Sequence, residues 1–311
     1  MAGPYVHLIL VHQLLQKENI TACFPSQSEF SQIAESFAPY VLLGAIAPDY
    51  PNLGVATHSA HWADVMHCTR PATVIACAAA VISNSCGPAR CKQMAWLMGY
   101  CSHLAADMTI HPVVQAKVGP YSQNRLMHRV CEMHQDSYFH RKMDMGEIKA
   151  SEIFARTVAM CGINGNKSEL DPDITSLWEK VLAEGDEERF AATPPDITGW
   201  HREFITLISD TCRNPQKIFP LAALISRSID KPYPNHREIN FDFVNNLTIP
   251  LDKPLSLHYD EIFERAIGNI TALWRIIESC IVLGKPESTL SPCIWNLDNG
   301  RDDQGRLVLW E

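Results

Sequence analysis

Apolar side chains recur every three or four residues along most of the chain, which is the period of an α-helix that buries one face. The period-two alternation of half-buried strands is scarce, and Pro, Gly and Asn fall mainly between the periodic segments. The pattern therefore predicts an all-α fold, a bundle of many helices. Helices are expected over residues 5–17, 28–37, 72–83, 88–110, 122–142, 147–160, 173–185, 197–213, 215–229 and 256–281.

Two long stretches, 42–71 and 231–254, show no helical period. A structureless loop of such length is uncommon inside a compact chain, so each stretch either carries function or hides an element. Histidines concentrate early, because ten of the 13 lie before residue 141. We therefore expect one domain over 1–311, in which 1–142 carries the chemistry and 143–311 forms a helical scaffold or a wall of the substrate site.

Charge and composition exclude some partners. The net charge is −9 and no basic cluster is present, so electrostatic binding to nucleic acid or to an anionic membrane is disfavoured. The longest strongly apolar run, 72–82, is far shorter than the ~20 residues of a membrane-spanning helix. The start of the chain lacks the basic segment of a secretory signal, and eleven cysteines without a CxxC pair favour reduced thiols. These features predict a cytoplasmic protein without a stable membrane anchor.

A polar stripe interrupts the otherwise apolar stretch GYCSHLAADMTIHP, residues 99–112. His103, Asp107 and His111 follow one another at intervals of four residues. At 3.6 residues per turn, such positions lie along one narrow line on a helix. Three polar groups on that line must face water, one another, or a ligand that binds all three.

The following predicted helix repeats the pattern. In LMHRVCEMHQDSYFH, residues 126–140, His128, Glu132 and Asp136 are again four residues apart. A short Gly-Pro turn separates the two helices, so we expect them to pack antiparallel with their stripes facing each other. Imidazole and carboxylate groups are ligands of Zn²⁺. Any one of these residues alone is more often a core histidine or part of an ion pair, but two such stripes on consecutive helices favour a metal site.

The stretch 42–71 adds further candidate ligands. Asp49 stands between Pro48 and the pair Tyr50-Pro51, and this rigid turn would hold its carboxylate in a fixed direction. An Asx-type turn is the alternative role of Asp49. The segment THSAHWADVMH, residues 57–67, then supplies three histidines and one carboxylate: His58, His61, His67 and Asp64.

The order of these motifs resembles the zinc-dependent phospholipase C family. The resemblance covers roughly residues 4–140 and rests on His7, on Asp49 in its Pro-Asp turn, on His61 followed by an aromatic residue, and on the HxxxD and HxxxE helices. The stretch SHLAADMTIHP is more similar to the bacterial intracellular members and to GPI-specific phospholipase D than to the secreted bacterial enzymes. The resemblance implies an all-α fold with a buried metal cluster.

The resemblance also implies a set of metal ligands, for two or three zinc ions. Asp49, His61, His103 and Asp107 would hold the first ion, and His111, His128 and Glu132 the second. His7 and the N-terminal end of the chain would hold a third ion with Asp107 as the bridge, and Ala2 could take part only after removal of Met1. His61 is the first choice because HWAD, residues 61–64, fits the family's segment best, and His58 and His67 are the alternatives. Asp64 and Asp136 are candidates to orient a ligand imidazole through its other ring nitrogen.

The activity implied is hydrolysis by a metal-activated water, most simply of a phosphoester, as a phosphodiesterase or a phosphatase. Asp49 would orient or deprotonate the water while it binds a metal ion. Two alternatives remain open from the sequence, a multi-zinc enzyme that acts on a non-phosphate metabolite and a non-catalytic, metal-stabilised binding protein. The expected partner is a small molecule that contains phosphate, and the sequence leaves the oligomeric state undetermined.

Overall fold

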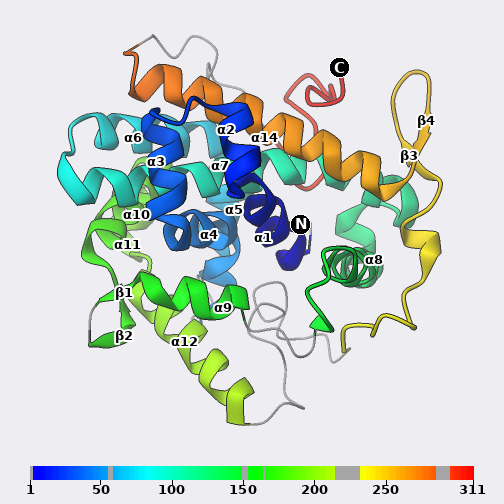
Figure 1. The fold of residues 1–311 in the computed structure, drawn as a ribbon, viewed down its shortest axis with the longest axis horizontal. Coiled ribbons are helices and arrows are strands. Elements are labelled where there is room, and N and C mark those ends of the chain that lie inside the picture. The colour runs from blue at the N-terminus through cyan, green and yellow to red at the C-terminus, as the bar shows by residue number, and fades with distance from the viewer. Residues whose placement is uncertain (1–2, 55–58, 149–152, 164, 214–231, 285–294) are drawn as a thin grey trace.

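A long central helix, α7 (Gly87–Val118), organises the fold (Figure 1). The structure is a computed structural model that describes residues 3–54, 59–148, 153–163, 165–213, 232–284 and 295–311. α7 packs against α4 (Ala38–Ile46) on one side and against α14 (Tyr259–Ile281) on another. Every residue of α7 from Gln93 to Val114 is buried. A polar side chain in this stretch must therefore find its partners inside the protein.

The predicted all-α class is confirmed for the described residues. Their strands form only two small antiparallel hairpins, β1 (Gly162–Ile163) with β2 (Asn166–Leu170) and β3 (Leu247–Ile249) with β4 (Leu255–Leu257). The remaining helices of at least six residues are α1 (Pro4–Leu14), α2 (Lys17–Cys23), α3 (Glu29–Ser36), η1 (Ala47–Leu53), α5 (Ser59–Asp64), α6 (Pro71–Ser83), α8 (Tyr121–Lys142), α9 (Ile153–Val158), α10 (Pro172–Gly185), α11 (Glu187–Ala192) and α12 (Ile197–Arg213). Three shorter helical turns are η2 (Val65–Thr69), η4 (Ala159–Cys161) and η5 (Phe241–Phe243).

The stretch 42–71, which shows no periodicity, is helical in most of its described residues. It contains the end of α4, the 3-10 helix η1, α5 and the π-helical turn η2. Apolar residues surround α4, and its residues from Val41 to Ile46 are all buried, so no apolar stripe marks it in the sequence. Helix prediction from periodicity failed here because the helix has no solvent-facing side.

Helix ends also differ from expectation in the first helix and in α7. The helix expected over 5–17 ends at Leu14, and α2 begins after Gln16, whose backbone is extended. The helix expected over 88–110 continues through Pro112 and ends at Val118, before Gly119 with φ of 90°. Pro112 has no N–H to donate to the Met108 carbonyl four residues earlier, which normally ends or kinks a helix.

Two glycines bring α4 and α7 into backbone contact. A Cβ atom on Gly44 would lie 2.0 Å from the carbonyl oxygen of Trp96, and one on Gly99 would lie 2.0 Å from the carbonyl oxygen of Val41. Real side chains do not reach such distances, so each position requires glycine for this approach. The contact places the end of α4, and η1 after it, directly beside the middle of α7.

The second half of the chain surrounds this core. α14 begins at Tyr259, later than the expected residue 256, with a capping box between His258 and Glu261. Within the stretch expected to be helical over 147–160, the described helices are α9 and η4. The helix expected over 215–229 lies outside the described residues.

Residues 295–311, which we call the C-terminal segment, lie against the far end of α7. The indole Nε1–H of Trp310 donates a hydrogen bond of 3.0 Å to the carbonyl of Thr109. A Cβ atom on Gly300 would lie 2.3 Å from Cγ of Pro112 and 2.7 Å from the carbonyl oxygen of Met108. The segment therefore covers the part of α7 that the proline weakens.

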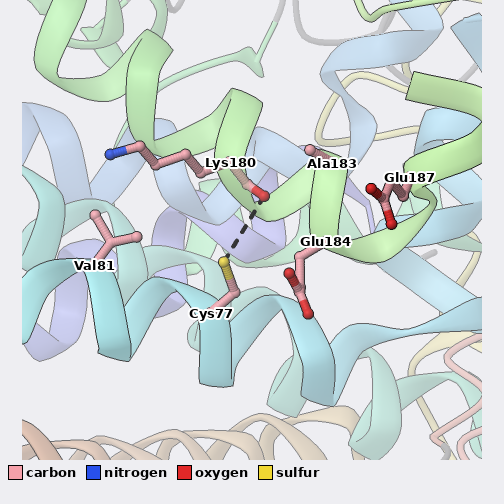
Figure 2. Close-up of a pocket in the computed structure, with 6 residues that line it drawn as sticks. All are labelled: Cys77, Val81, Lys180, Ala183, Glu184 and Glu187. Atoms are coloured by element: carbon pink, nitrogen blue, oxygen red, sulfur yellow. Dashed lines mark hydrogen bonds between the residues drawn. The ribbon is translucent and has the colours of Figure 1, made fainter. Parts of the chain in front are cut away.

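No single described helix is long and apolar enough to cross a membrane, although two pairs of helices pass the same test when they are joined across bends of 87° and 89°. One surface pocket of about 450 Å³ lies between α6, α10 and α11 (Figure 2). In it, the thiol of Cys77 donates to the carbonyl of Lys180 over 3.8 Å. The pocket's lining residues include none of the candidate metal ligands.

Candidate metal centre

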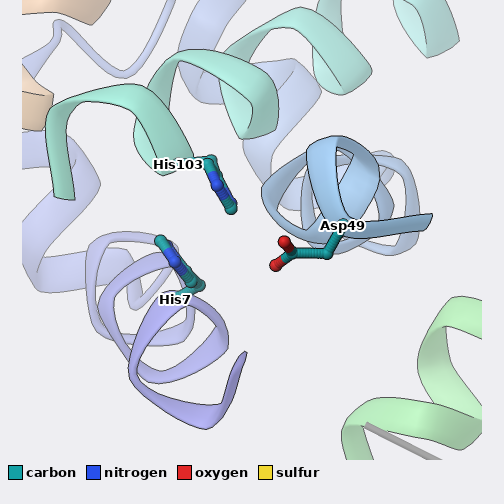
Figure 3. A group of neighbouring side chains, drawn as sticks. All are labelled: His7, Asp49 and His103. Atoms are coloured by element: carbon teal, nitrogen blue, oxygen red, sulfur yellow. The ribbon is translucent and has the colours of Figure 1, made fainter. Parts of the chain in front are cut away.

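Four elements direct polar side chains to one buried point. His7 comes from α1, Asp49 from η1 and His67 from η2, while His103 and Asp107 come from α7. Figure 3 shows the rings of His7 and His103 and the carboxylate of Asp49 meeting from three different elements. The five residues are between 0% and 5% exposed. A group of buried imidazoles and carboxylates is the donor set expected of a zinc site.

Asp107 is the centre of one group. Its Oδ1 atom lies 3.3 Å from Nε2 of His7 and 3.3 Å from Nε2 of His111. Its Oδ2 atom lies 3.2 Å from Nε2 of His103. The two carboxylate oxygens therefore face different histidines, as a carboxylate that bridges two metal ions would.

A second group joins Asp49, His67 and His103. Oδ1 of Asp49 lies 3.3 Å from Nε2 of His67, and the Nε2 atoms of His67 and His103 are 3.2 Å apart. Ligand atoms bound tetrahedrally at the usual zinc distances are separated by about 3.3 Å. The observed separations match the edges of such a tetrahedron.

Backbone carbonyls assign the tautomers of three rings. Each ring places Nδ1 at hydrogen-bond distance from a carbonyl oxygen: His103 from that of Ala45, His67 from that of Ala63 and His111 from that of Leu297. Because a carbonyl only accepts, the proton of each neutral ring resides on Nδ1. The Nε2 atoms then present lone pairs to carboxylates and to one another, an arrangement that a bound cation would stabilise.

The pKa values of Asp49 and Asp107 also favour a bound cation. Burial alone would raise the pKa of Asp49, but contact with His67 and the nearby rings of His103 and His7 leave it below its usual value. Burial would likewise raise the pKa of Asp107, but the rings of His111 and His103 hold it well below its usual value.

Two of the rings stay neutral in this environment. Burial and the nearby ring of His7 lower the pKa of His103, and burial lowers the pKa of His111 to about 4. Contact with Asp49 instead raises the pKa of His67, although burial opposes this. The cluster thus gathers two buried carboxylates with lowered pKa values, and a bound cation would stabilise such buried charge. The residues present therefore fit Zn²⁺.

His67, not His61, occupies the place expected for the histidine of the HWAD segment. The side chain of His61 is 28% exposed, and its Nε2 contacts Oδ2 of Asp186 at 2.9 Å, outside the cluster. The π-helical turn of η2 carries the chain inward after α5 and directs His67 to Asp49. Asp64 is exposed, so its expected role as an orienting carboxylate has no support in its position. The expected roles of Ala2 and His58 fall outside the described residues.

The expected second group, His111, His128 and Glu132, is not brought together as one set of close ligand atoms in the described part of the chain. Nε2 of His128 donates to the carbonyl of Gly119 over 2.6 Å. Its Nδ1 atom is buried and has no hydrogen-bond partner among the described residues, so it presents a lone pair. Burial raises the pKa of Glu132, although the charge of Arg129 opposes this.

Asp136 serves a different purpose from the one expected. Its Oδ1 accepts a hydrogen bond of 2.8 Å from the backbone N–H of Val6, and its Oδ2 accepts one of 2.9 Å from the hydroxyl of Tyr233. These bonds attach the first turn of α1 to α8 immediately before His7. The carboxylate therefore places a helix that carries a candidate ligand, and it does so without orienting a ligand imidazole directly.

One positioning pair gave no signal in the sequence. The hydroxyl of Tyr50, next to Asp49, donates to Nδ1 of His201 over 3.0 Å, and Nε2 of His201 donates to the carbonyl of Lys167 over 3.0 Å. Burial lowers the pKa of His201 to about 4, so the ring is neutral in this chain of hydrogen bonds. The partners are 151 residues apart, so no local motif connects them.

Comparison with known families supports the assignment. A family model described as zinc dependent phospholipase C matches residues 6–188, more than half of the chain, and this range contains every residue of the cluster. A search among curated proteins and a search among solved structures each return no significant match. The matched range, the helical fold and the buried histidine and aspartate groups agree with one another. The chain belongs to the zinc-dependent phospholipase C family, a family of zinc hydrolases that act on phosphoesters.

Proposed function

We propose that this protein hydrolyses a small phosphodiester at a cluster of two or three zinc ions. The observation that carries the proposal is the set of ligand-atom separations of 3.2–3.3 Å around Asp107 and Asp49. Several donor atoms from four elements converge at the spacing of a zinc coordination shell. A bound cation would stabilise this buried group of lone pairs and carboxylates.

The proposed ligands of the first ion are Asp49, His67, His103 and Asp107, with His67 in the place first expected for His61. The second ion would use His111, with His128 and Glu132 completing its shell. Nδ1 of His128 is the buried nitrogen left for that purpose, because Nε2 is bound to a carbonyl. His7 would bind a third ion together with Asp107.

Bound zinc supplies two things in such a site: a coordinated water whose pKa falls towards ~7, and positive charge near the phosphoryl oxygens. Asp49 is assigned the task of orienting the attacking water. Its lowered pKa keeps the carboxylate ionised, so it accepts a hydrogen bond from the water well but is a weak store for its proton. Asp49 is itself held by η1, whose Tyr50 is fixed to His201.

The cluster's surroundings suit an anionic substrate only in the presence of metal. The chain carries a net charge of −9, and the proposed site contributes buried carboxylates of its own. A phosphate would be repelled by these groups unless bound cations reversed the local charge. Both substrate binding and catalysis should therefore require the metal ions.

The two alternative functions predict different properties of the site. A multi-zinc enzyme that acts on a non-phosphate metabolite would keep the same ligands but would not recognise phosphorus. A non-catalytic binding protein would close every coordination position. Family membership supports a hydrolase of phosphoesters over both.

Elemental analysis followed by a substrate screen tests the proposal. Protein purified without chelator should contain at least two equivalents of zinc. It should hydrolyse bis-p-nitrophenyl phosphate faster than p-nitrophenyl phosphate, and a short-chain phosphatidylcholine in the same screen distinguishes a lipid substrate from a free phosphodiester. Less than half an equivalent of zinc after reconstitution would refute the metal site. Full zinc content with no phosphoester hydrolysed would instead refute the proposed reaction.

A further inference from the structure

We propose that the C-terminal segment, residues 295–311, is part of the metal centre and determines which nitrogen of His111 faces it. The carbonyl of Leu297 accepts the hydrogen bond from Nδ1 of His111. Leu297 lies far beyond residue 188, where the family match ends. This inference rests on the proposed metal site, since it concerns the positioning of one proposed ligand.

The position of His111 in α7 explains why it needs external support. His111 immediately precedes Pro112, where the helix lacks one backbone hydrogen bond. His111 is also the last of the three stripe residues, and its Nε2 lies 3.3 Å from Oδ1 of Asp107. The opposite tautomer would place the proton on Nε2, and the resulting N–H group could not bind a metal ion.

The C-terminal segment contacts the same turn of α7 at three points. Leu297 contacts His111, Gly300 packs against Pro112 and the Met108 carbonyl, and Trp310 donates to the Thr109 carbonyl over 3.0 Å. Each contact falls between residues 108 and 112. The segment therefore fixes the helix and the ring together.

Asp298 follows Leu297 and supports the same assignment. Burial lowers the pKa of both His111 and His128, and the charge of Asp298 opposes that effect at both rings. Asp298 therefore lies near two proposed ligands of the second ion. The direct contact of the segment with a proposed ligand is the bond from His111 to the Leu297 backbone carbonyl.

Two glycines in the C-terminal segment give a matched pair of variants. Gly300 and Gly305 both have positive φ, 67° and 77°, so a side chain strains the backbone similarly at either position. A Cβ atom on Gly300 would collide with Pro112, while one on Gly305 would have nothing within 4 Å. Gly300→Ala should therefore displace the segment from α7, and Gly305→Ala should leave it in place.

Zinc retention is the first readout. Partners that orient a metal-binding histidine typically contribute 10–100-fold to metal affinity. Gly300→Ala should weaken retention of one zinc equivalent by about 10–100-fold in competition with a chelator, while Gly305→Ala should stay within about twofold of wild type. Trp310→Phe, which removes the bond to Thr109 but keeps an aromatic ring at this position, is the second test variant and should give a smaller loss of the same equivalent.

The tautomer of His111 is the second readout and needs neither zinc nor activity. In metal-free protein labelled with ¹⁵N-histidine, the proton on Nδ1 of His111 should give a slowly exchanging resonance, assigned with His111→Asn. This resonance should broaden or shift in Gly300→Ala and in Trp310→Phe but not in Gly305→Ala.

The outcomes separate this inference from the proposed function. If wild type binds zinc and both test variants match Gly305→Ala in zinc retention and in the His111 resonance, the C-terminal segment has no part in the site. If Gly300→Ala fails to fold, Trp310→Phe decides by the same two measurements. If wild type binds no zinc, the proposed function fails, while the Nδ1 resonance still shows whether Leu297 sets the tautomer.

Discussion

Helices α7 and α8 carry the same spacing of polar residues, and the structure uses the two stripes differently. On α7, the side chains of His103 and His111 both turn to the carboxylate of Asp107 between them. On α8, His128 bonds to the Gly119 carbonyl and Asp136 bonds to the start of α1. A shared period thus defines a shared face in both helices, but only α7 brings its stripe together as a cluster.

The difference follows from what surrounds each helix. α7 is enclosed along its middle by α4, α14 and other helices, so its polar residues find all their partners inside the protein. These partners are one another, side chains aimed inward, and the backbone carbonyls of Ala45 and Leu297. α8 is exposed over its first turns and has a non-helical residue, Asn124, before His128. Its polar residues therefore meet backbone groups of neighbouring segments. Sequence spacing predicts direction, and burial decides the partner.

The largest expected effect is at Asp107. Asp107→Asn keeps the size of the side chain but removes the charge that faces three histidines. At least one zinc equivalent should be lost and hydrolysis should fall by more than about 100-fold, beyond the range of residues that only orient a ligand. Metal analysis and turnover of the same preparation measure both.

Asp64→Asn is the control for Asp107→Asn. Asp64 is an exposed aspartate of the same half of the chain, so its variant should keep wild-type zinc content and turnover. Wild-type zinc content in Asp107→Asn would show that the α7 stripe is an ordinary buried polar network.

The second-largest expected effect tests whether His67 or His61 binds the first zinc ion. His67→Asn removes Nε2 and keeps a group that can donate to the Ala63 carbonyl, so the first zinc ion should be lost with little unfolding. His61→Asn breaks a solvent-exposed pair with Asp186, so it should leave the zinc content and the fold unchanged. Zinc content and circular dichroism of the two variants provide the comparison. A loss of zinc in His61→Asn but not in His67→Asn would reverse the assignment.

His128→Gln tests whether α8 joins the cluster at all. The glutamine amide can still donate to the Gly119 carbonyl in place of Nε2, but no atom replaces the buried Nδ1. We expect one zinc equivalent fewer and a smaller loss of hydrolysis than in Asp107→Asn. Unchanged zinc content would limit the metal centre to α1, η1, η2 and α7.

The smallest effect on activity is expected at Asp136. Substitution there should instead change how the free energy of unfolding depends on pH. Burial raises the pKa of Asp136 to about 7, although Arg129 and the bonds from Val6 and Tyr233 oppose this. The unfolded chain has the ordinary value of about 4, so between these pH values the folded protein binds one proton more. The contribution of this group to the free energy of unfolding is therefore complete below pH 4 and falls, by up to about 4 kcal/mol, as the pH rises to 7.

Asp136→Asn lacks this titration, so its stability relative to wild type should improve from pH 4 to pH 7. Urea unfolding of metal-free protein at several pH values measures the difference. Tyr233→Phe keeps the carboxylate but removes a bond that lowers its pKa, so its stability should still fall as the pH rises, over a range that extends to higher pH than in wild type. Parallel stability curves for wild type and Asp136→Asn would contradict this explanation.

The sequence predicted the helical class and most of the residues that meet in the cluster, because those features depend on local spacing. His7, Asp49, His103 and Asp107 all belong to the sequence motifs, and the structure brings them together. Their roles as metal ligands stay predictions, as does the expectation of one domain over 1–311.

The missed features depend on contacts that local spacing does not encode. The choice between His61 and His67 depends on a π-helical turn that redirects the chain between them. The continuation of α7 through Pro112 depends on cover from the C-terminal segment, and the partner of His111 is a carbonyl 186 residues away. A backbone carbonyl has no sequence signature, so no motif could have identified Leu297.

The backbone contact between α4 and α7 at Gly44 and Gly99 limits how far the positions of the candidate metal ligands can vary. The Ala45 carbonyl, one residue after Gly44, holds the ring of His103 at 2.9 Å, and Asp49 follows four residues later. Zinc sites accept deviations of only about 0.2 Å in their bond lengths. A single methyl group at either glycine would require a far larger separation of the helices, since it would start 2.0 Å from a carbonyl oxygen. Whether an ion fits the centre thus depends on Gly44 and Gly99, two residues that have no side chain to bind it.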